Sequence, residues 1–151
     1  PTLDWDDVKW VRDQWKGKLI LKGILDPEDV EPAIASGADA IIVSNHGGRQ
    51  LDGALSAIRA LPAIVEAVRG RTEVHLDSGV RSGQDVIKAL ALGARAVHVG
   101  RAFVYGLGAM GEAGVTTALA ILRKELDVTM GFCGLRDVKK VDRSILVPGT
   151  Y

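Results

Sequence analysis

The chain has 151 residues, with 19 Lys or Arg and 19 Asp or Glu, so its formal net charge at neutral pH is zero. This balance removes the electrostatic argument for a nucleic-acid partner or an anionic membrane surface. The single cysteine, Cys133, excludes a disulfide framework and a multi-cysteine metal cluster, and it suits a reducing cytosol.

The order of apolar and charged residues in the sequence shows no targeting signal. No apolar run approaches the roughly 18 residues that a membrane-spanning helix needs, and no signal peptide opens the chain. Because Pro1 is an unusual first residue for a native protein, we expect a fragment, a processed chain or an engineered one.

Helical and strand patterns alternate along the chain. Trp5, Val8, Val11 and Trp15 share one helical face, which predicts an amphipathic helix with packed tryptophans that ends at Gly17. The expected strands are 19–22, 40–44, 74–77 and 96–99. The expected helices are about 27–36, 54–69 and 84–92, followed by a long helical region after Arg101 and a polar tail over 134–151 with at most a short helix.

Two features inside the helical segments need interpretation. Pro62 predicts a kink in the helix over 54–69, or a break into two shorter helices. The segment Gly106-Leu-Gly108-Ala-Met-Gly111 has the glycine spacing of a dinucleotide-binding turn, but it follows no strand directly and lies in a helical stretch. We interpret that spacing as a coincidence.

Four consecutive strand–helix units predict an α/β fold with a parallel sheet and right-handed crossovers. Such units are half of a (β/α)8 TIM barrel, which usually takes about 250 residues. The first and fourth strands would be apolar open edges, so we expect another half, cut off or present as a separate chain. An open doubly wound sheet is the alternative, but the turn Gly23-Ile-Leu-Asp-Pro lacks its glycine fingerprint.

The unusual polar residues all follow the expected strands, and in a barrel they would meet at the carboxyl-terminal mouth, where active sites are built. After the second strand comes Ser-Asn-His-Gly-Gly-Arg, where two glycines free the backbone beside an imidazole and a guanidinium. Glycines around Arg81, and Gly100 before Arg101, suit a phosphate dianion. Ordinary glycine turns with solvated arginines are the alternative for either loop alone.

The segments LILKGIL, GADAIIVSNHGGRQLDG, DSGVRSGQDVIKALALGA and VGRAFVYGL cover roughly residues 18–110. In this order they resemble the carboxyl-terminal half of the FMN-dependent L-2-hydroxy acid oxidases and dehydrogenases. That family includes glycolate oxidase, L-lactate dehydrogenase and (S)-mandelate dehydrogenase. The resemblance implies strands five to eight of a (β/α)8 barrel, with β/α units over about 1–133 and a polar tail over 134–151.

The resemblance also implies a role for each polar residue. His46 would be the base that removes the hydroxyl proton or the α-proton of the substrate. Arg49 would bind the substrate carboxylate as a bidentate pair. The implied FMN-binding residues are Lys22 at the N1–C2=O edge, Ser44, Asp77 at the ribityl hydroxyls, Ser78 and Val80, with Gly79, Arg81, Gly100 and Arg101 at the phosphate. No metal site is expected.

Several roles of the family have no counterpart here. The aspartate that orients the family's histidine, its substrate-binding tyrosines and its tryptophan-containing loop belong to the first half of the barrel. We therefore expect residues 1–151 alone neither to turn over nor to bind FMN tightly. His75 and His98 alternate with apolar residues inside strands, so we interpret them as structural, and Cys133 as inert.

The expected partners are a small 2-hydroxy acid, the N-terminal half of the barrel and further copies in a homo-oligomer, which is a tetramer in the family. The expected location is the cytoplasm, with peripheral attachment to the inner membrane as an alternative. Two other functions stay open: an inosine-monophosphate dehydrogenase type of enzyme, which would need a loop cysteine that is absent beside His46, and a non-enzymatic half-barrel module.

Overall fold

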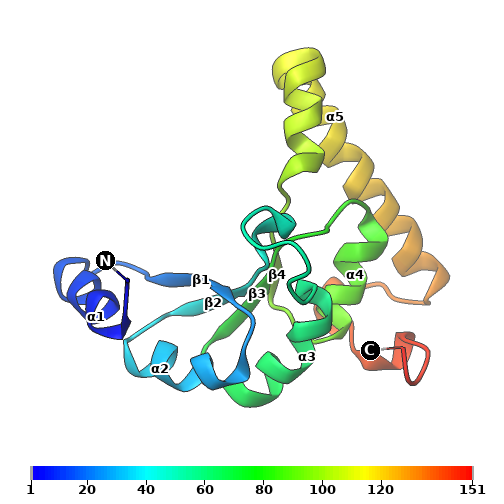
Figure 1. The fold of residues 1–151 in the computed structure, drawn as a ribbon. Coiled ribbons are helices and arrows are strands. Elements are labelled where there is room, and N and C mark those ends of the chain that lie inside the picture. The colour runs from blue at the N-terminus through cyan, green and yellow to red at the C-terminus, as the bar shows by residue number, and fades with distance from the viewer. Residues whose placement is uncertain (1, 151) are drawn as a thin grey trace.

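The computed structural model describes residues 2–150 and contains one sheet of four parallel strands. The strands lie in chain order, β1-β2-β3-β4. Their bounds are Ile20–Ile24 for β1, Ala40–Val43 for β2, Glu73–Leu76 for β3 and Ala96–Val97 for β4. The predicted α/β architecture with a parallel sheet is therefore confirmed (Figure 1).

Helices follow the strands as the alternation predicts. Their bounds are Trp5–Gln14 for α1, Val30–Ala35 for α2, Ala57–Val68 for α3, Gly83–Ala91 for α4 and Arg101–Phe132 for α5. Four 3-10 turns, η1 to η4, cover Pro27–Asp29, His46–Gly48, Val138–Lys140 and Arg143–Ile145. Asp26 caps η1 by accepting a hydrogen bond from the Glu28 N–H, as its place before Pro27 predicts.

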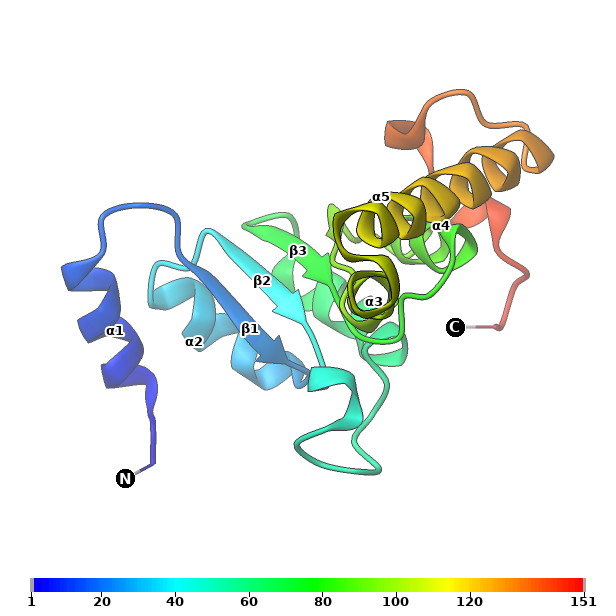
Figure 2. The same ribbon diagram turned by 90° about the horizontal axis from the view of Figure 1, so that it is seen from above.

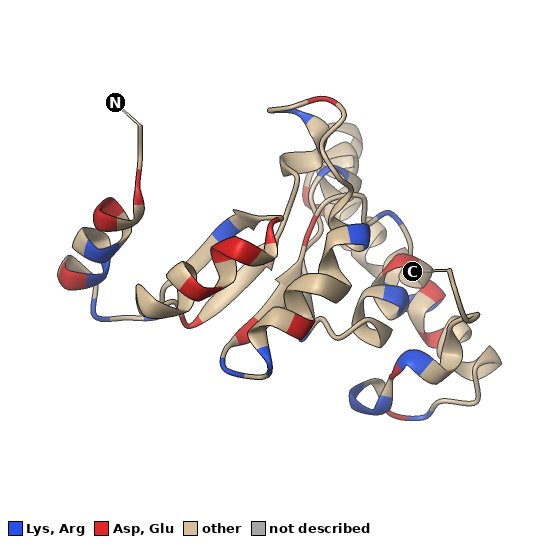
Figure 3. Ribbon diagram, turned by 60° about the horizontal axis from the view of Figure 1, so that its bottom comes forward, with Lys and Arg blue, Asp and Glu red and all other residues tan. Residues whose placement is uncertain are grey.

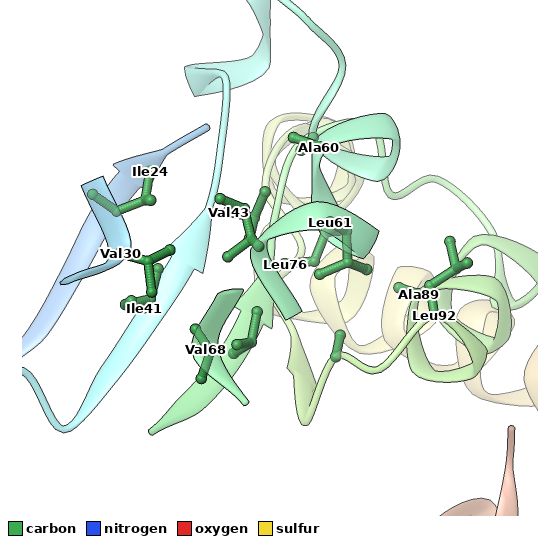
Figure 4. Packing of buried hydrophobic residues seen from close by; sticks show 14 of the residues in the cluster. Ile24, Val30, Ile41, Val43, Ala60, Leu61, Val68, Leu76, Ala89 and Leu92 are labelled. Atoms are coloured by element: carbon green, nitrogen blue, oxygen red, sulfur yellow. The ribbon is translucent and has the colours of Figure 1, made fainter. Parts of the chain in front are cut away.

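The hydrophobic core lies between the sheet and the helices on one of its faces. Ile41 and Val43 of β2 and Leu76 of β3 pack near Leu61 of α3 there (Figure 4). Ile64 of α3 belongs to the same cluster. Seen from above, α2 lies behind β1 and β2 (Figure 2). Because side chains alternate along a strand, the other face carries Lys22 and His75 in register with Ile42.

The structure corrects two predicted boundaries. Pro62 neither breaks nor ends its helix: α3 runs uninterrupted from Ala57, after Ser56, rather than from 54. A proline inside a helix removes one backbone hydrogen bond and crowds the preceding turn. Leu61 and Ile64 on either side of Pro62 are fully buried, and this packing offsets that cost. The fourth strand has two residues instead of four, since its outer edge has no strand to pair with among the described residues.

The predicted packing of the face formed by Trp5, Val8, Val11 and Trp15 is wrong for Val11 and Trp15, which are exposed. α1 buries none of its residues, and Trp10 and Trp15 are 65% and 56% exposed. Only Trp5 contacts the core. α1 lies beside the β1 edge of the sheet, where no second layer covers it (Figure 1).

The long helical region is a hairpin rather than a straight helix. Met110 and Gly111 depart from helical geometry, Gly111 with a φ of +60°, and the chain reverses there (Figure 1). A Cβ on Gly106 would overlap the backbone of Gly114, and the reverse also holds. The glycine spacing that resembled a nucleotide-binding turn therefore serves a tight helix–helix crossing.

By length and composition α5 is apolar enough to cross a membrane, with a mean hydropathy of 1.2 over its most apolar 18 residues and 6% of that window buried. The composition is more apolar than the sequence analysis expected. The reversal at Gly111 divides the helix, and its second leg carries Glu112, Arg123, Lys124 and Glu125. Neither leg is therefore a continuous apolar span of the length that a bilayer needs.

Acidic and basic residues are distributed along the whole chain (Figure 3). The net charge of zero leaves no overall excess of either sign. Charges can therefore favour binding only where a few like-charged side chains lie together.

The helical hairpin predicts opposite effects of two glycine substitutions. Gly106→Ala should lower the free energy of unfolding by about 2 kcal/mol, because its methyl group overlaps the Gly114 backbone. Gly108→Ala meets no atom within 4 Å and should be neutral or raise it by about 0.5–1 kcal/mol. Urea unfolding of both variants measures the difference, and equal effects would contradict this packing.

Candidate active site

Polar side chains converge at the carboxyl-terminal ends of the four strands. They surround a cavity of about 1110 Å³. It is lined by Lys22, His46, Gly47, Arg49, Gln50, Asp77, Ser78, Gly79, Val80, Arg81, His98, Val99, Gly100, Arg101, Ala102, Val104 and Tyr105. Apart from Ser44, every residue that the sequence analysis assigned to the site lines this one cavity.

Ser44 lies directly beneath the cavity, fully buried at the end of β2. Its Oγ accepts hydrogen bonds from Lys22 Nζ at 3.0 Å and from the His46 N–H at 3.1 Å. It also lies 3.4 Å from Ser78 Oγ. One hydroxyl therefore connects the ammonium, the histidine loop and the loop after β3.

Lys22 and Asp77 form an ion pair across β2, with Nζ and Oδ2 2.8 Å apart. Burial opposes ionisation of Asp77, but hydrogen bonds from Lys22, Ser44 and Ser78 outweigh it and hold the pKa of Asp77 below its usual range. Ser78 donates to Asp77 Oδ1 at 2.7 Å. The pair is thus a fixed dipole whose positive end is the Lys22 ammonium.

The backbone of His46 is left-handed, with a φ of +56°, a conformation that costs a non-glycine residue about 1 kcal/mol or more. Its N–H bond to Ser44 and the Gly47 bonds to Asn45 Oδ1 and Ser78 Oγ hold the loop in this shape. The ring packs against Gly23, where a Cβ would lie 2.9 Å from His46 Cε1. A register shift in β1 between Lys22 and Ile24 accommodates this contact.

Arg101 ties the last strand to this loop by donating from Nη2 to the Gly47 carbonyl at 3.1 Å. Arg49 ends η2 and lines the cavity, and among residues 2–150 its side chain takes part in no ion pair. One guanidinium therefore supports the loop, while the other stays available to an anion.

The two expected phosphate loops differ in how their N–H groups are used. At α4, Asp85 accepts from the N–H groups of Arg81 and Ser82, so the capping box occupies that helix start. At α5, the N-cap is Gly100, which has no side chain to cap the helix. The start of α5 therefore keeps the unpaired N–H groups that attract an anion, beside the guanidinium of Arg101.

His98 lines the cavity together with Lys22 and Asp77. It was predicted to be structural, because it alternates with apolar residues. The available signal was its position: His98 is two residues before Gly100, at the same strand ends as the other polar groups. Asn45 was also missed, and its Asx-type bond to Gly47 shapes the loop.

A family model described as "FMN-dependent dehydrogenase" matches residues 1–148. The chain belongs to the FMN-dependent dehydrogenase family. This agrees with the resemblance in the sequence and does not support the inosine-monophosphate dehydrogenase alternative.

Curated members of this family are close in sequence. The chain is 57% identical to an L-lactate dehydrogenase of Caulobacter vibrioides over 97% of its own length and 38% of that protein. It is 53% identical to an L-lactate dehydrogenase of Stenotrophomonas maltophilia, over 97% of this chain and 39% of the relative. The chain thus spans about two fifths of the curated relatives that it matches.

Solved structures of the family share the fold. A mandelate oxidase superposes with a TM-score of 0.88 at 48% identity, over 93% of this chain and 43% of that one. A (S)-mandelate dehydrogenase, described as a monotopic membrane protein, gives a TM-score of 0.90 at 45% identity, over 95% and 38%. One mandelate oxidase structure is described as holding an FMN adduct, which supports FMN as the cofactor of the family.

The low pKa of Asp77 predicts a pH-dependent contribution to stability. Since the folded pKa lies below the ordinary 3.8, the contribution is complete above that value and is lost as the pH falls through the folded pKa. Asp77→Asn should lower the free energy of unfolding by about 2 kcal/mol near pH 6. This deficit should shrink as the pH falls below 3.8 and through the folded pKa.

Urea unfolding at several pH values measures this deficit. Asp52→Asn is the matched control, because Asp52 is exposed and its carboxylate accepts only from the neighbouring Gly53 N–H among residues 2–150. A deficit of Asp77→Asn that stays constant with pH would contradict the assignment.

Proposed function

We propose that the protein containing this chain oxidises an L-2-hydroxy acid to a 2-oxo acid with FMN. The observation that carries the proposal is one cavity at the strand ends that contains the imidazole of His46, the ion-paired Lys22 and the hydrogen-bonded Arg101. It also contains the guanidinium groups of Arg49 and Arg81, which form no ion pair within residues 2–150. These are the groups that an anionic substrate and a phosphorylated cofactor require. The relatives named L-lactate dehydrogenase and mandelate oxidase support this substrate class.

The residues of the cavity fit FMN. The uncapped start of α5 with Gly100 and Arg101 suits the phosphate, and Arg81 lines the same cavity. Asp77 offers carboxylate oxygens to ribityl hydroxyls. Lys22 offers a fixed positive charge, which its ion pair with Asp77 keeps in place. We propose that Ser44, Ser78, Gly79 and Val80 complete the cofactor site.

In the proposed reaction, Arg49 binds the substrate carboxylate through two parallel N–H···O bonds and so orients carbon 2. His46 accepts a proton, from the hydroxyl group or from carbon 2, and its constrained backbone fixes the direction of transfer. FMN, when bound, supplies the two-electron acceptor. The Lys22 ammonium would stabilise negative charge that develops on the reduced cofactor.

We further propose that the chain forms strands five to eight of a (β/α)8 barrel. The parallel sheet with two unpaired outer strands and the match to about two fifths of the relatives support this. A preceding segment would supply the other strands, the partner of His46 and the remaining substrate contacts. We also propose a homo-oligomer in the cytoplasm, and the monotopic mandelate dehydrogenase supports peripheral attachment to a membrane as an alternative.

His46→Gln in the intact protein tests the proposed base. Its turnover of L-lactate or L-mandelate should fall by about 10²–10⁴-fold, while the yellow flavin spectrum stays. Arg49→Lys keeps the charge but loses the bidentate geometry, so it should mainly raise KM. Steady-state kinetics with both substrates separates the two effects, and full turnover in His46→Gln would overturn the role of His46.

Residues 1–151 purified alone should bind FMN weakly and show no turnover, because the groups proposed for the first half of the barrel are not part of it. Fluorescence titration with FMN and a 2-hydroxy acid assay measure both properties. A yellow, active sample of this segment would contradict the half-barrel proposal, whereas a colourless dimer would favour a non-enzymatic module.

A further inference from the structure

The imidazole of His98, which lines the cavity, lies against the imidazole of His75. His75 of β3 is 8% exposed, and its Nδ1 lies 3.1 Å from Nε2 of His98, just beyond β4. The ring centroids are 5.3 Å apart. The proposed oxidation uses neither residue, and a buried histidine held by another histidine is an unusual way to fill space between strands.

A carboxylate decides where the protons of this pair lie. Glu73 Oε2 lies 3.1 Å from His75 Nε2. Since an ionised carboxylate only accepts, His75 carries its proton on Nε2 and accepts at Nδ1. His98 must then donate from Nε2, which leaves its Nδ1 as a free acceptor in the neutral ring. Among residues 2–150 that Nδ1 has no hydrogen-bond partner, and His98 lines the cavity.

The charged groups nearest the pair form two ion pairs, and further cationic side chains line the cavity. Lys22 of β1 faces Asp77, which follows β3, and Arg95 before β4 lies 4.0 Å from Glu73. Across the cavity are His46, Arg49, Arg81 and Arg101. Burial and repulsion from His75 lower the pKa of His98, which favours its neutral ring. Negative charge placed in the cavity would reverse this preference.

We propose that His98 is a cofactor-site residue whose free Nδ1, oriented by the Glu73–His75–His98 chain, takes up a proton when FMN in this cavity is reduced. This rests on the proposed FMN site. In the step, FMN accepts two electrons and one proton and so gains one negative charge. A second proton moves from solvent to His98 Nδ1, and the N–H bond formed there breaks again when FMN is reoxidised.

The midpoint potential of the FMN-loaded intact protein, measured against pH, tests the proposal. If His98 takes up a proton, the midpoint potential should fall with pH at the slope expected for two protons per two electrons. That slope is twice the one expected when reduction takes up a single proton. His98→Gln keeps an amide to donate to His75 but cannot titrate, so its slope should halve over the same pH range. Equal slopes in the two proteins would overturn the proposal.

Two carboxylate variants separate the role of the Glu73–His75–His98 hydrogen bonds from a general effect of charge. Glu73→Gln removes the carboxylate that accepts from His75, so the pH range with the steeper slope of the midpoint potential should move to lower pH. Glu31→Gln, at an exposed carboxylate on α2 that pairs with Arg71, should behave as the wild type. An unshifted pH range in Glu73→Gln would contradict the role of that carboxylate.

Nitrogen-15 NMR of the imidazoles gives a readout that needs no variant. The Nδ1 resonance of His98 should change from an unprotonated to a protonated shift when the bound flavin is reduced, and an unchanged resonance would overturn the proposal. If the intact protein carries no flavin at all, the proposed function fails. If the flavin is present but the slope and the resonance do not change, only the role of His98 fails.

Discussion

The parallel direction of all four strands is the constraint on which the site depends. Parallel strands place their carboxyl ends at the same edge, so Lys22, Ser44 and Asp77 meet although they are far apart in the chain. The register Lys22–Ile42–His75 then orders their neighbours. An antiparallel strand in the sheet would direct its loop to the opposite edge and remove its polar group from the cavity.

At that edge of the sheet, hydrogen bonds stabilise left-handed backbone conformations that residues other than glycine rarely adopt. His46 and Ser78 both have positive φ values, and their loops are connected through the Ser44 and Ser78 hydroxyls. Strain of this kind persists where the surroundings determine the conformation. The same network keeps Lys22 and Asp77 paired, so positioning of the imidazole and positioning of the charge depend on shared atoms.

The cavity therefore joins three kinds of chemistry along one edge of a half-buried sheet. An uncapped helix start and Arg101 suit an anion, the Lys22–Asp77 pair provides a fixed dipole, and His46 supplies the imidazole that we propose as the proton acceptor. The His75–His98 pair adds a second titratable group beside the dipole. By the proposal above, negative charge brought in by a ligand would favour protonation of His98.

The sequence alone determined the element order, the parallel sheet and the polar residues at the strand ends, because periodicity, caps and glycines are local signals. It also identified the family through the segment around His46. Only the tertiary structure decided that Pro62 stays inside α3, that α5 folds back at Gly111, that Trp10 and Trp15 stay exposed, and that His75 meets His98. These features depend on packing between residues distant in the chain, which local patterns do not encode.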